Sequence, residues 1–409
     1  MNKNRMIRLL ALMWCAGLLL ALPACSSDDP GPDPTEQGGG NSDDNNKGDD
    51  EQGGGNEEDN KGNDEPGGGN GDEELPSLPF EYGLIITVAQ DGSGDCTTVG
   101  EALGMIRNVS KYNIIRIKPG IYREKLTVSK NKIILYGEDP ETTILTYDDC
   151  AGTIGSDGKE LGTQGSASFT VNANDFMALN LTFENPHVNT TGTGDPAVAV
   201  GVFKDRAAFY NCRLLGYQDT FYPKNHARVY CKECYIEGNV DFIFGDAALV
   251  CENCTLCCNR NDSVLTAPAT SHESKFGFVF MDCVITTIDG NDFQDKPISR
   301  IYLGRAWQQG PRAVFIRCEE PDCLAAAGWS KMNDTVVAAL FAEYQCTGEG
   351  AAADRLSQRA NGGRQLTDAE AAEYTLENIF AKESYQPTNS SEKGYAYLSD
   401  WMPLAPFTL

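Results

Sequence analysis

Two aspartates, Asp219 and Asp241, close two similar segments of the chain. Each lies seven residues after a cysteine and three after a glycine, in Cys212-Arg-Leu-Leu-Gly-Tyr-Gln-Asp219 and Cys234-Tyr-Ile-Glu-Gly-Asn-Val-Asp241. If the repeated unit is one turn of a coiled sheet, the aspartates lie on adjacent strands, about 4.7–4.9 Å apart. At that separation two carboxyl groups titrate as a coupled pair, with one acid and one carboxylate at neutral pH. The pair therefore predicts acid, base or nucleophilic chemistry.

The residue before Asp219 indicates which reaction the pair could serve. Adjacent residues on a flat strand face opposite ways, so Gln218 and Asp219 share a site only where the chain bends, and Gly216 makes such a bend possible. A retaining glycosidase also places two carboxyl groups about 5 Å apart. A neutral amide donor beside an acid suits an oxyanion better than an oxocarbenium ion, so we favour acyl chemistry.

The histidines offer a different kind of site. His187, His226 and His272 lie in polar, loop-like sequence with no serine or cysteine motif nearby. A histidine-based triad is therefore disfavoured.

Cysteines recur with similar neighbours along the chain. They end the segments Phe209-Tyr-Asn-Cys212, Cys231-Lys-Glu-Cys234, Cys251-Glu-Asn-Cys254, Phe280-Met-Asp-Cys283 and Phe315-Ile-Arg-Cys318. Their spacings of 22, 20, 29 and 35 residues fit a coil of about 20 residues that accepts loops at one corner. Short β-rich runs with polar corners at such a period predict an all-β solenoid.

Four of these cysteines allow a competing interpretation. Cys231 and Cys234, followed by Cys251 and Cys254, have the spacing of a four-cysteine zinc site. Because Cys234 and Cys254 belong to the repeated series, we favour small thiols stacked inside the coil. An exported protein could also oxidise some of them, for instance Cys231 with Cys251, and the sequence leaves that pairing open.

Two helices are expected at the ends of the solenoid, where open coils need caps. The segment from Thr98 to Asn108 reads as a short amphipathic helix. Near the other end, Thr367 and Glu370 form a capping box that opens a helix through about Phe380.

The N-terminus predicts export. Three basic residues precede an apolar run from Leu9 to Leu22, which is too short for a comfortable membrane span and is typical of a secretory signal. It ends in Leu-Pro-Ala-Cys25, which resembles the lipobox of bacterial lipoproteins. We expect residues 1–25 to be a signal, Cys25 to be lipidated and the protein to reach the outer membrane. A plain signal peptidase site is the alternative, and display on the cell surface stays open.

Residues 26–78 are nearly devoid of apolar side chains and contain Gly-Gly-Gly-Asn three times. Such a segment cannot bury enough apolar surface to offset its chain entropy, so we expect an unstructured tether. The net charge of −26 lies partly there, but residues 79–409 are acidic too. This charge disfavours nucleic acid and anionic membranes as partners, so membrane contact is expected only through a lipid at Cys25.

Three ordered signatures resemble those of the pectin methylesterase family of carbohydrate esterases. They are Gly216-Tyr-Gln-Asp-Thr-Phe-Tyr222, Gly238-Asn-Val-Asp-Phe-Ile-Phe-Gly245 and Leu303-Gly-Arg-Ala-Trp307. Weaker similarity, from Gln90-Asp-Gly-Ser-Gly94 to Glu343-Tyr-Gln-Cys-Thr-Gly348, extends it over nearly all of residues 83–360. The resemblance implies that residues 79–409 form a right-handed parallel β-helix. It also implies hydrolysis of galacturonic methyl esters without a metal or other cofactor.

The resemblance also implies a role for each residue of the pair and its neighbours. Asp241 is the nucleophile that forms an acyl-enzyme, and Arg305 keeps it ionised and oriented. Asp219 protonates the departing methanol and then activates water, while Gln218 donates to the oxyanion.

Three aromatic residues complete the expected site. Trp307, Tyr222 and Phe244 correspond to residues that line the sugar groove of the family. Methyl-esterified pectin is therefore the expected partner, and we expect the protein to act as a monomer.

One position departs from the family. A glutamine that supplies a second oxyanion donor usually opens the segment that here begins at Pro196. Proline has neither a side-chain amide nor a backbone N–H. Losing one such donor elsewhere costs about 100- to 1000-fold in rate. Asn189, Thr191 and Thr193 in the preceding loop are candidate substitutes.

Two other functions stay open on the sequence. The change at Pro196 favours a catalytically weak or silent polysaccharide-binding β-helix. A polygalacturonase or pectate lyase on the same architecture is weaker. Arg116-Ile117-Lys118 is similar to a glycosidase tripeptide but lies far upstream of the acids, and the paired aspartates sit beside an amide rather than in a calcium-binding cluster.

Overall fold

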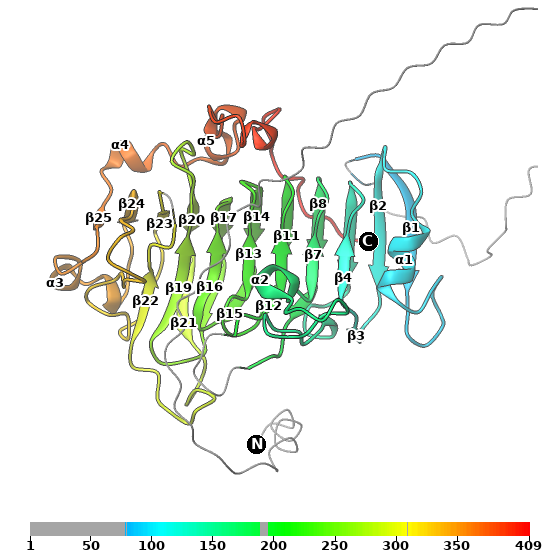
Figure 1. Cartoon of the computed structure of the whole chain (residues 1–409), viewed down its shortest axis with the longest axis horizontal. Coiled ribbons are helices and arrows are strands. Elements are labelled where there is room, and N and C mark those ends of the chain that lie inside the picture. Colours follow the sequence, from blue (N-terminus) through cyan, green and yellow to red (C-terminus); the bar gives the residue numbers. More distant parts are fainter. Residues whose placement is uncertain (1–77, 79, 189–194, 309) are drawn as a thin grey trace, which may run out of the picture. The chain divides into compact units, whose positions relative to one another are not determined.

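The computed structural model describes residues 78, 80–188, 195–308 and 310–409. The predicted signal at 1–25 and the tether at 26–78, Leu78 apart, lie outside this range. The described chain winds through three parallel sheets, here called sheets A, B and C (Figure 1). Each full coil adds one strand to each sheet, as β11, β12 and β13 do before β14, β15 and β16. This is the predicted all-β, right-handed parallel β-helix.

Sheet A has eleven strands: β1 (Tyr82–Val88), β2 (Tyr112–Ile117), β5 (Ile133–Gly137), β8 (Phe176–Leu179), β11 (Ala207–Tyr210), β14 (Arg228–Lys232), β17 (Ala248–Glu252), β20 (Phe278–Met281), β23 (Arg312–Ile316), β24 (Leu340–Tyr344) and β25 (Gly363–Gln365). Sheet B has seven: β3 (Gly120–Arg123), β6 (Thr143–Thr146), β9 (Thr182–Glu184), β12 (Arg213–Leu215), β15 (Tyr235–Gly238), β18 (Thr255–Cys258) and β21 (Val284–Thr287). Sheet C has seven: β4 (Leu126–Val128), β7 (Phe169–Val171), β10 (Val200–Val202), β13 (Phe221–Pro223), β16 (Val240–Gly245), β19 (Ser263–Pro268) and β22 (Ile301–Gly304).

The helices are short. They are α1 (Val99–Met105), α2 (Gly162–Gly165), α3 (Ala353–Leu356), α4 (Asp368–Ala371) and α5 (Leu376–Ile379), with 3-10 turns η2 (Glu349–Ala351), η3 (Lys382–Ser384) and η4 (Lys393–Tyr395). Among the described residues, none of these helices has the length and apolar character needed to cross a bilayer.

The repeated cysteines form a ladder inside the coil at the corner between sheets A and B. Each follows a residue with positive φ, such as Asn211 at 48° and Asn253 at 52°, which turns the chain tightly from one sheet to the next. The thiols donate weak hydrogen bonds to a backbone carbonyl one coil earlier: Cys234 to Phe209 at 3.4 Å, Cys254 to Cys231 at 3.5 Å, Cys283 to Cys251 at 3.3 Å and Cys318 to Phe280 at 3.5 Å. The prediction of stacked core thiols is confirmed.

The zinc and disulfide alternatives for these cysteines are not realised. Cys231 and Cys251 are register partners within β14 and β17, whereas Cys234 and Cys254 lie past the corner. All thirteen cysteines of the described chain are free thiols, and these four do not gather their sulfur atoms into a metal-binding group.

The predicted helix after Thr98 closes the first coil. Thr98 is its N-cap, and the capping box with Glu101 is complete. Val99 and Ala102 are buried against the inner core, which explains why α1 forms here. The helix ends at Met105, three residues earlier than Asn108.

The predicted helix from Thr367 to Phe380 is two separate turns, so that expectation was wrong in extent. Thr367 and Glu370 make the predicted capping box for α4, which lies near β25 in Figure 1. Thr375 then interrupts the helix, because its hydroxyl accepts from the Asn378 N–H at 3.2 Å and so caps a new helix, α5.

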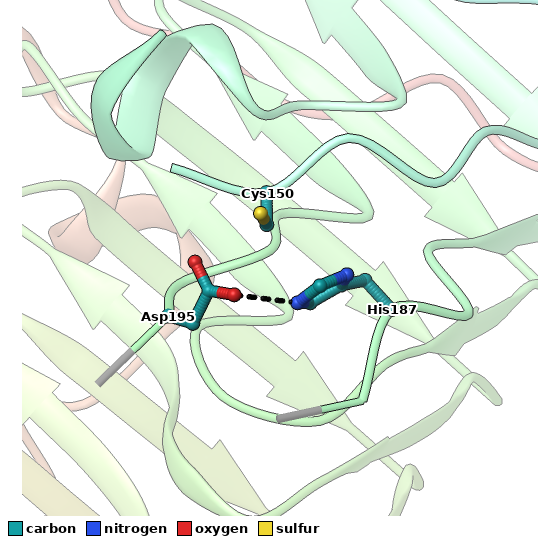
Figure 2. A group of neighbouring side chains, drawn as sticks. All are labelled: Cys150, His187 and Asp195. Carbon is teal, nitrogen blue, oxygen red and sulfur yellow. Dashed lines mark hydrogen bonds and ion pairs between the residues drawn. The ribbon is translucent and has the colours of Figure 1, made fainter. Parts of the chain in front are cut away.

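Loops between sheets B and C lie side by side at one corner of the coil. The loop after β6 reaches the loop after β9, where Ala151 N–H donates to the Pro196 carbonyl at 2.7 Å. Three side chains, Cys150, His187 and Asp195, converge there (Figure 2).

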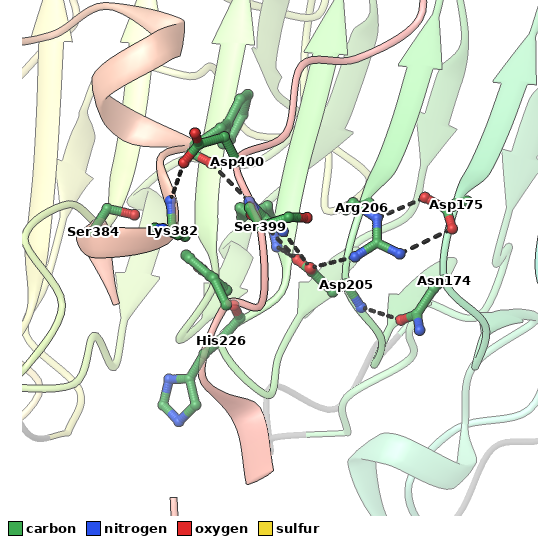
Figure 3. Close-up of polar contacts among 12 residues, drawn as sticks. Asn174, Asp175, Asp205, Arg206, His226, Lys382, Ser384, Ser399 and Asp400 are labelled. Carbon is green, nitrogen blue, oxygen red and sulfur yellow. Dashed lines mark hydrogen bonds and ion pairs between the residues drawn. The ribbon is translucent and has the colours of Figure 1, made fainter. Parts of the chain in front are cut away.

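The C-terminal segment packs along the outer face of sheet A, which the sequence did not predict. Phe380 is fully buried there, and Trp401 and Phe407 pack against the same apolar cluster. Arg228 of β14 is completely buried and donates to the carbonyls of Phe380 and Ser399, both at 2.7 Å. Asp205 accepts from Arg228 and links it to Arg206 in the network of Figure 3.

Candidate functional site

The structure places Asp219 and Asp241 on adjacent coils in near register. Phe221 of β13 pairs with Ile243 of β16, and each aspartate lies two residues before one of these partners. The Asp219 N–H donates to the Val240 carbonyl at 3.1 Å, which ties the two corners together. Cysteine, glycine and aspartate therefore recur at the same spacing because the two segments stack as successive coils.

Both aspartates adopt left-handed backbone conformations. Their φ angles are 65° for Asp219 and 51° for Asp241, a region that aspartate tolerates better than most residues. At Asp241 the pairing of β16 with β19 also shifts by one residue. This bulge re-aims the side chain, as bulges near functional sites commonly do. The bend required by the adjacent Gln218 and Asp219 thus lies at Asp219 itself.

The two glycines of the repeat are required by close approach. A Cβ on Gly216 would lie 2.6 Å from the Thr220 hydroxyl, and one on Gly238 would lie 2.2 Å from the Phe242 Cβ. Both contacts are too short for any side chain, so glycine allows the corner before each aspartate to fold tightly.

Arg305 binds Asp241 with a fork of two hydrogen bonds. Its Nε donates to Oδ1 at 2.8 Å and its Nη2 donates to Oδ2 at 2.6 Å. Arg305 follows β22, and β19 lies between β22 and β16, so the guanidinium reaches across one strand. The side chain of Asp241 is 9% exposed and that of Arg305 is 23% exposed, so the pair opens to solvent at one edge. Such a bidentate pair fixes both the charge and the direction of the carboxylate.

The environment separates the protonation states of the two acids. Burial, and then the negative charge of Asp241, raise the pKa of Asp219 well above its ordinary value, while Arg305 and Gln218 lower it only in part. Burial raises the pKa of Asp241 as well, but the hydrogen bonds and charge of Arg305 oppose that rise. The proton of the pair therefore resides on Asp219, and Asp241 is the carboxylate.

Gln218 lies in the same turn as Asp219. Its side chain lowers the pKa of the Asp219 carboxyl group, and its backbone carbonyl accepts from the Ala197 N–H at 3.2 Å. The turn therefore brings the amide and the acid into one site, as the sequence required.

The predicted aromatic residues gather beside the acids on the outer face of sheet C. Tyr222 stacks on Phe244 with 4.0 Å between ring centroids, and Phe244 lies 5.9 Å from Trp307. Tyr222 and Phe244 are each only 4% exposed, whereas Trp307 is half-buried. Trp307 thus presents more of its ring than the other two.

Two supporting residues could not be predicted from the sequence. Asn259, two coils after Gly216, donates to the Gly216 carbonyl at 2.9 Å and to Glu237 at 3.1 Å, and so holds the Asp219 corner. Phe203 packs edge-on against Tyr222 at 5.7 Å and extends the aromatic cluster. Neither residue belongs to a recognisable motif, because both act through contacts between coils.

Pro196 borders the site on the coil before Asp219. Its carbonyl accepts from Ala151, and the next residue, Ala197, contacts the Gln218 carbonyl. The candidate replacement donors Asn189, Thr191 and Thr193 lie outside the described residues.

Comparison with known proteins places the chain in a family. The pectinesterase family model matches residues 85–383. The chain therefore belongs to the pectinesterase family. Pectinesterase 31 of Arabidopsis thaliana is 37% identical over 313 residues, which cover 74% of this chain and 94% of that protein.

Solved structures of other pectinesterases resemble this one throughout the β-helix. The pectin methylesterase PemA of Erwinia chrysanthemi has a TM-score of 0.65 and 30% identity, and covers 80% of this chain and 99% of its own. The carrot pectin methylesterase has a TM-score of 0.64 and 31% identity, over 73% of this chain and 93% of its own. A pectin methylesterase in complex with a hexasaccharide has a TM-score of 0.65 and 29% identity, over 81% of this chain and all of its own.

Proposed function

We propose that this pectinesterase removes methyl esters from galacturonic acid units of pectin with Asp241 as nucleophile and Asp219 as acid and base. Family membership makes the chain a carboxylic ester hydrolase that acts on pectin. The observation that supports the two roles is the asymmetry of the pair. Arg305 grips Asp241 with two hydrogen bonds, while burial and the charge of Asp241 keep the proton on Asp219.

The first half of the reaction transfers the acyl group to the enzyme. A carboxylate oxygen of Asp241 attacks the ester carbonyl carbon, and the carbonyl oxygen becomes an oxyanion that accepts a hydrogen bond from the Gln218 amide. When the intermediate collapses, the bond to the methoxy oxygen breaks and that oxygen takes the proton of Asp219. Methanol leaves, and an anhydride joins Asp241 to the galacturonyl group.

The second half restores the pair. Asp219, now a carboxylate, takes a proton from a water molecule as the water oxygen attacks the galacturonyl carbonyl. The anhydride bond to Asp241 breaks, Asp241 regains its negative charge, and the product leaves as a galacturonic acid that ionises in solution. Each turnover therefore yields one methanol and one proton.

The aromatic cluster supplies a place for the sugar. Trp307 is half-buried and lies over Phe244, which is stacked in turn on Tyr222. We assign Trp307 as the ring that packs against a pyranose face, with Phe244 and Tyr222 holding it in position. The hexasaccharide complex of a related pectin methylesterase supports a saccharide chain as the ligand.

Methanol release from pectins of graded esterification tests the proposal. We expect release to increase with the degree of methylation and each methanol to be matched by one titrated acid. Failure to release methanol, with retained binding to pectin, would instead identify a silent polysaccharide-binding β-helix. New reducing ends or unsaturated products would identify a polygalacturonase or a lyase.

Pro196 bears on the rate of this reaction rather than on its type. Because proline offers no donor, the oxyanion relies on Gln218 and on any donor from another residue. If the missing amide limits catalysis, Pro196→Gln should raise kcat, at most by the roughly 100- to 1000-fold that one oxyanion donor contributes. An unchanged or lower kcat would mean that another group already fills the place.

We also propose that the protein is an outer-membrane lipoprotein anchored through Cys25 and acts as a monomer. The lipobox-like Leu-Pro-Ala-Cys25 and the long polar segment after it support export and a tethered enzyme. Metabolic labelling with a palmitate analogue should tag the wild-type protein and leave Cys25→Ser untagged. Equal labelling of both, or recovery of the wild type without lipid, would contradict the anchor.

A further inference from the structure

A second group of reactive side chains lies at the corner between sheets B and C. Cys150 follows β6, His187 follows β9 and Asp195 precedes β10. One ligand atom from each, the Cys150 sulfur, a His187 ring nitrogen and an Asp195 oxygen, lies within 4.8 Å of the other two. His187 Nε2 and Asp195 Oδ2 are 2.7 Å apart. Figure 2 shows the thiol above that contact, so that the three polar ends face one another.

The surrounding backbone holds these residues in place. The Ala151 N–H donates to the Pro196 carbonyl at 2.7 Å, which fixes the residues next to Cys150 and Asp195 against each other. The fully buried Asn185 donates to the carbonyls of Asp149 at 2.9 Å and Val198 at 3.2 Å. Its Oδ1 also accepts from the His187 N–H at 3.1 Å. Because the bonds from Ala151 to Pro196 and from Asn185 to Asp149 join successive coils, the fold holds the cluster in place.

We propose that Cys150, His187 and Asp195 bind one zinc ion. A thiolate, an imidazole and a carboxylate form a donor set that suits zinc, and three protein ligands with one water are a common tetrahedral arrangement. Zinc bond lengths place neighbouring ligand atoms roughly 3.4 Å apart. The His187 to Asp195 contact, at 2.7 Å, must therefore open slightly to admit the ion.

The same residue types could instead form a cysteine nucleophile with a histidine base, but the geometry favours the metal. In such a triad one ring nitrogen faces the acid and the other faces the sulfur. The hydroxyl of Thr153, at 3.5 Å, is the hydrogen-bond partner of the Cys150 sulfur within the described chain. His187 uses Nε2 toward the acid and makes no hydrogen bond to the thiol in the described structure. These contacts therefore fit an ion bound between the three side chains better than a catalytic triad in which His187 takes a proton from the thiol.

Zinc at this corner would brace the edge of the active site. Asp195 immediately precedes Pro196, and Ala197 donates to the carbonyl of Gln218, the proposed oxyanion donor. An ion bound to Asp195 would hold this strand entry against the loop after β6. The zinc would thus have a structural role, separate from the ester chemistry at Asp241.

Zinc binding to the full-length protein tests the proposal without reliance on activity. The purified protein, stripped with a chelator, should bind one zinc per chain and unfold at a higher Tm when zinc is restored, because an ion that binds only the folded state stabilises it. Cys150→Ser and His187→Gln should each weaken zinc binding at least 10-fold. The matched controls Cys96→Ser and His272→Gln, at a half-buried thiol and a histidine elsewhere, should leave it unchanged.

Cobalt supplies a second readout. Co²⁺ in place of zinc should give a sulfur-to-metal charge-transfer band that Cys150→Ser abolishes and Cys96→Ser retains. The proposal is overturned if zinc binding and the cobalt band are absent from the wild type, if they survive in Cys150→Ser, or if an ester substrate acylates the Cys150 thiol. These results are independent of methanol release, so the zinc site and the esterase assignment can fail separately.

Discussion

Two regions of this protein each contain two acidic residues and one arginine, and use them differently. Asp219, Asp241 and Arg305 lie on the outer face of sheet C. Glu320, Glu343 and Arg359 lie near the C-terminal coils. In each trio the arginine makes two parallel hydrogen bonds to one acid: Arg359 Nε is 2.9 Å from Glu343 Oε2, and its Nη2 is 2.7 Å from Oε1. Arg359 Nη2 also donates to Glu320 Oε2 at 2.8 Å, so in this trio the arginine contacts both acids. In each, burial and the neighbouring charge raise the pKa of the other acid, and that of Glu320 reaches about 10.

The two trios differ in the solvent exposure of their side chains. The side chains of Glu320 and Glu343 are 0% exposed and that of Arg359 is 2% exposed. Arg359 also donates to the carbonyls of Ala326 at 3.2 Å and Gly350 at 3.0 Å, so the trio ties together the coils around it. The trio at Arg305 is partly open and lies beside an amide and an aromatic cluster. Coupled acids with an arginine therefore do not by themselves make an active site; an open face and an oxyanion donor are also needed.

Asp219→Asn should lower the rate far more than the matched change in the buried trio. Asparagine cannot give a proton to methanol or take one from water, so kcat should fall by roughly 100- to 10,000-fold. The fold should be unaffected, since Asp219 is neutral in the native state. Methanol release and circular dichroism measure the two effects. Glu320→Gln, the matched change in the buried trio, should retain the wild-type rate. A comparable loss of rate in that variant would show that the buried trio also takes part in catalysis.

Arg359→Gln should unfold the protein more easily without slowing the reaction. It leaves Glu343 as a buried, unpaired charge, which typically costs about 3–5 kcal/mol in the free energy of unfolding. Denaturant unfolding measures that loss. The rate per folded molecule should match the wild type, and a large fall in that rate would show that the buried trio also shapes the active site.

Arg305→Gln should alter catalysis and its pH dependence. Loss of the fork lets Asp241 turn away, which should lower the rate by roughly 100-fold. Arg305 lowers the pKa of both aspartates, so both should rise in the variant. The acid limb of the rate profile reflects ionisation of Asp241 and the basic limb reflects deprotonation of Asp219, so both limbs should move to higher pH. A pH profile that does not shift would show that Arg305 does not set the pKa values of the two aspartates.

Glu320→Gln should leave the rate unchanged and alter only the way stability depends on pH. The folded-state pKa of Glu320 is raised from 4.5 to about 10. Its contribution to stability is therefore complete below pH 4.5 and is lost as the pH rises toward 10. Glutamine does not titrate, so the variant should lose less stability than the wild type between pH 5 and pH 9. Thermal unfolding across that range is the measurement, and parallel curves would contradict the raised pKa.

The two trios also show which parts of the structure could be predicted from the sequence. The aspartates could be predicted as neighbours because both belong to one repeat, which sets their register on successive coils. Glu320 and Arg359 belong to no repeat, and only the closing coils bring them together. The Cys150, His187 and Asp195 group was missed for the same reason: two corner loops of different length meet across the stack. The helix expected after Thr367 was too long because Thr375 offers a competing cap, and nothing in the local sequence showed that the C-terminal segment would cover sheet A.

Methanol release by Asp241→Asn tests the central assignment most directly. The variant should fold normally, since asparagine keeps the shape of the side chain, and should bind methylated pectin. We predict no release above background, a loss of at least about 10,000-fold, because the amide cannot attack the ester. Turnover within tenfold of the wild type would contradict Asp241 as the nucleophile.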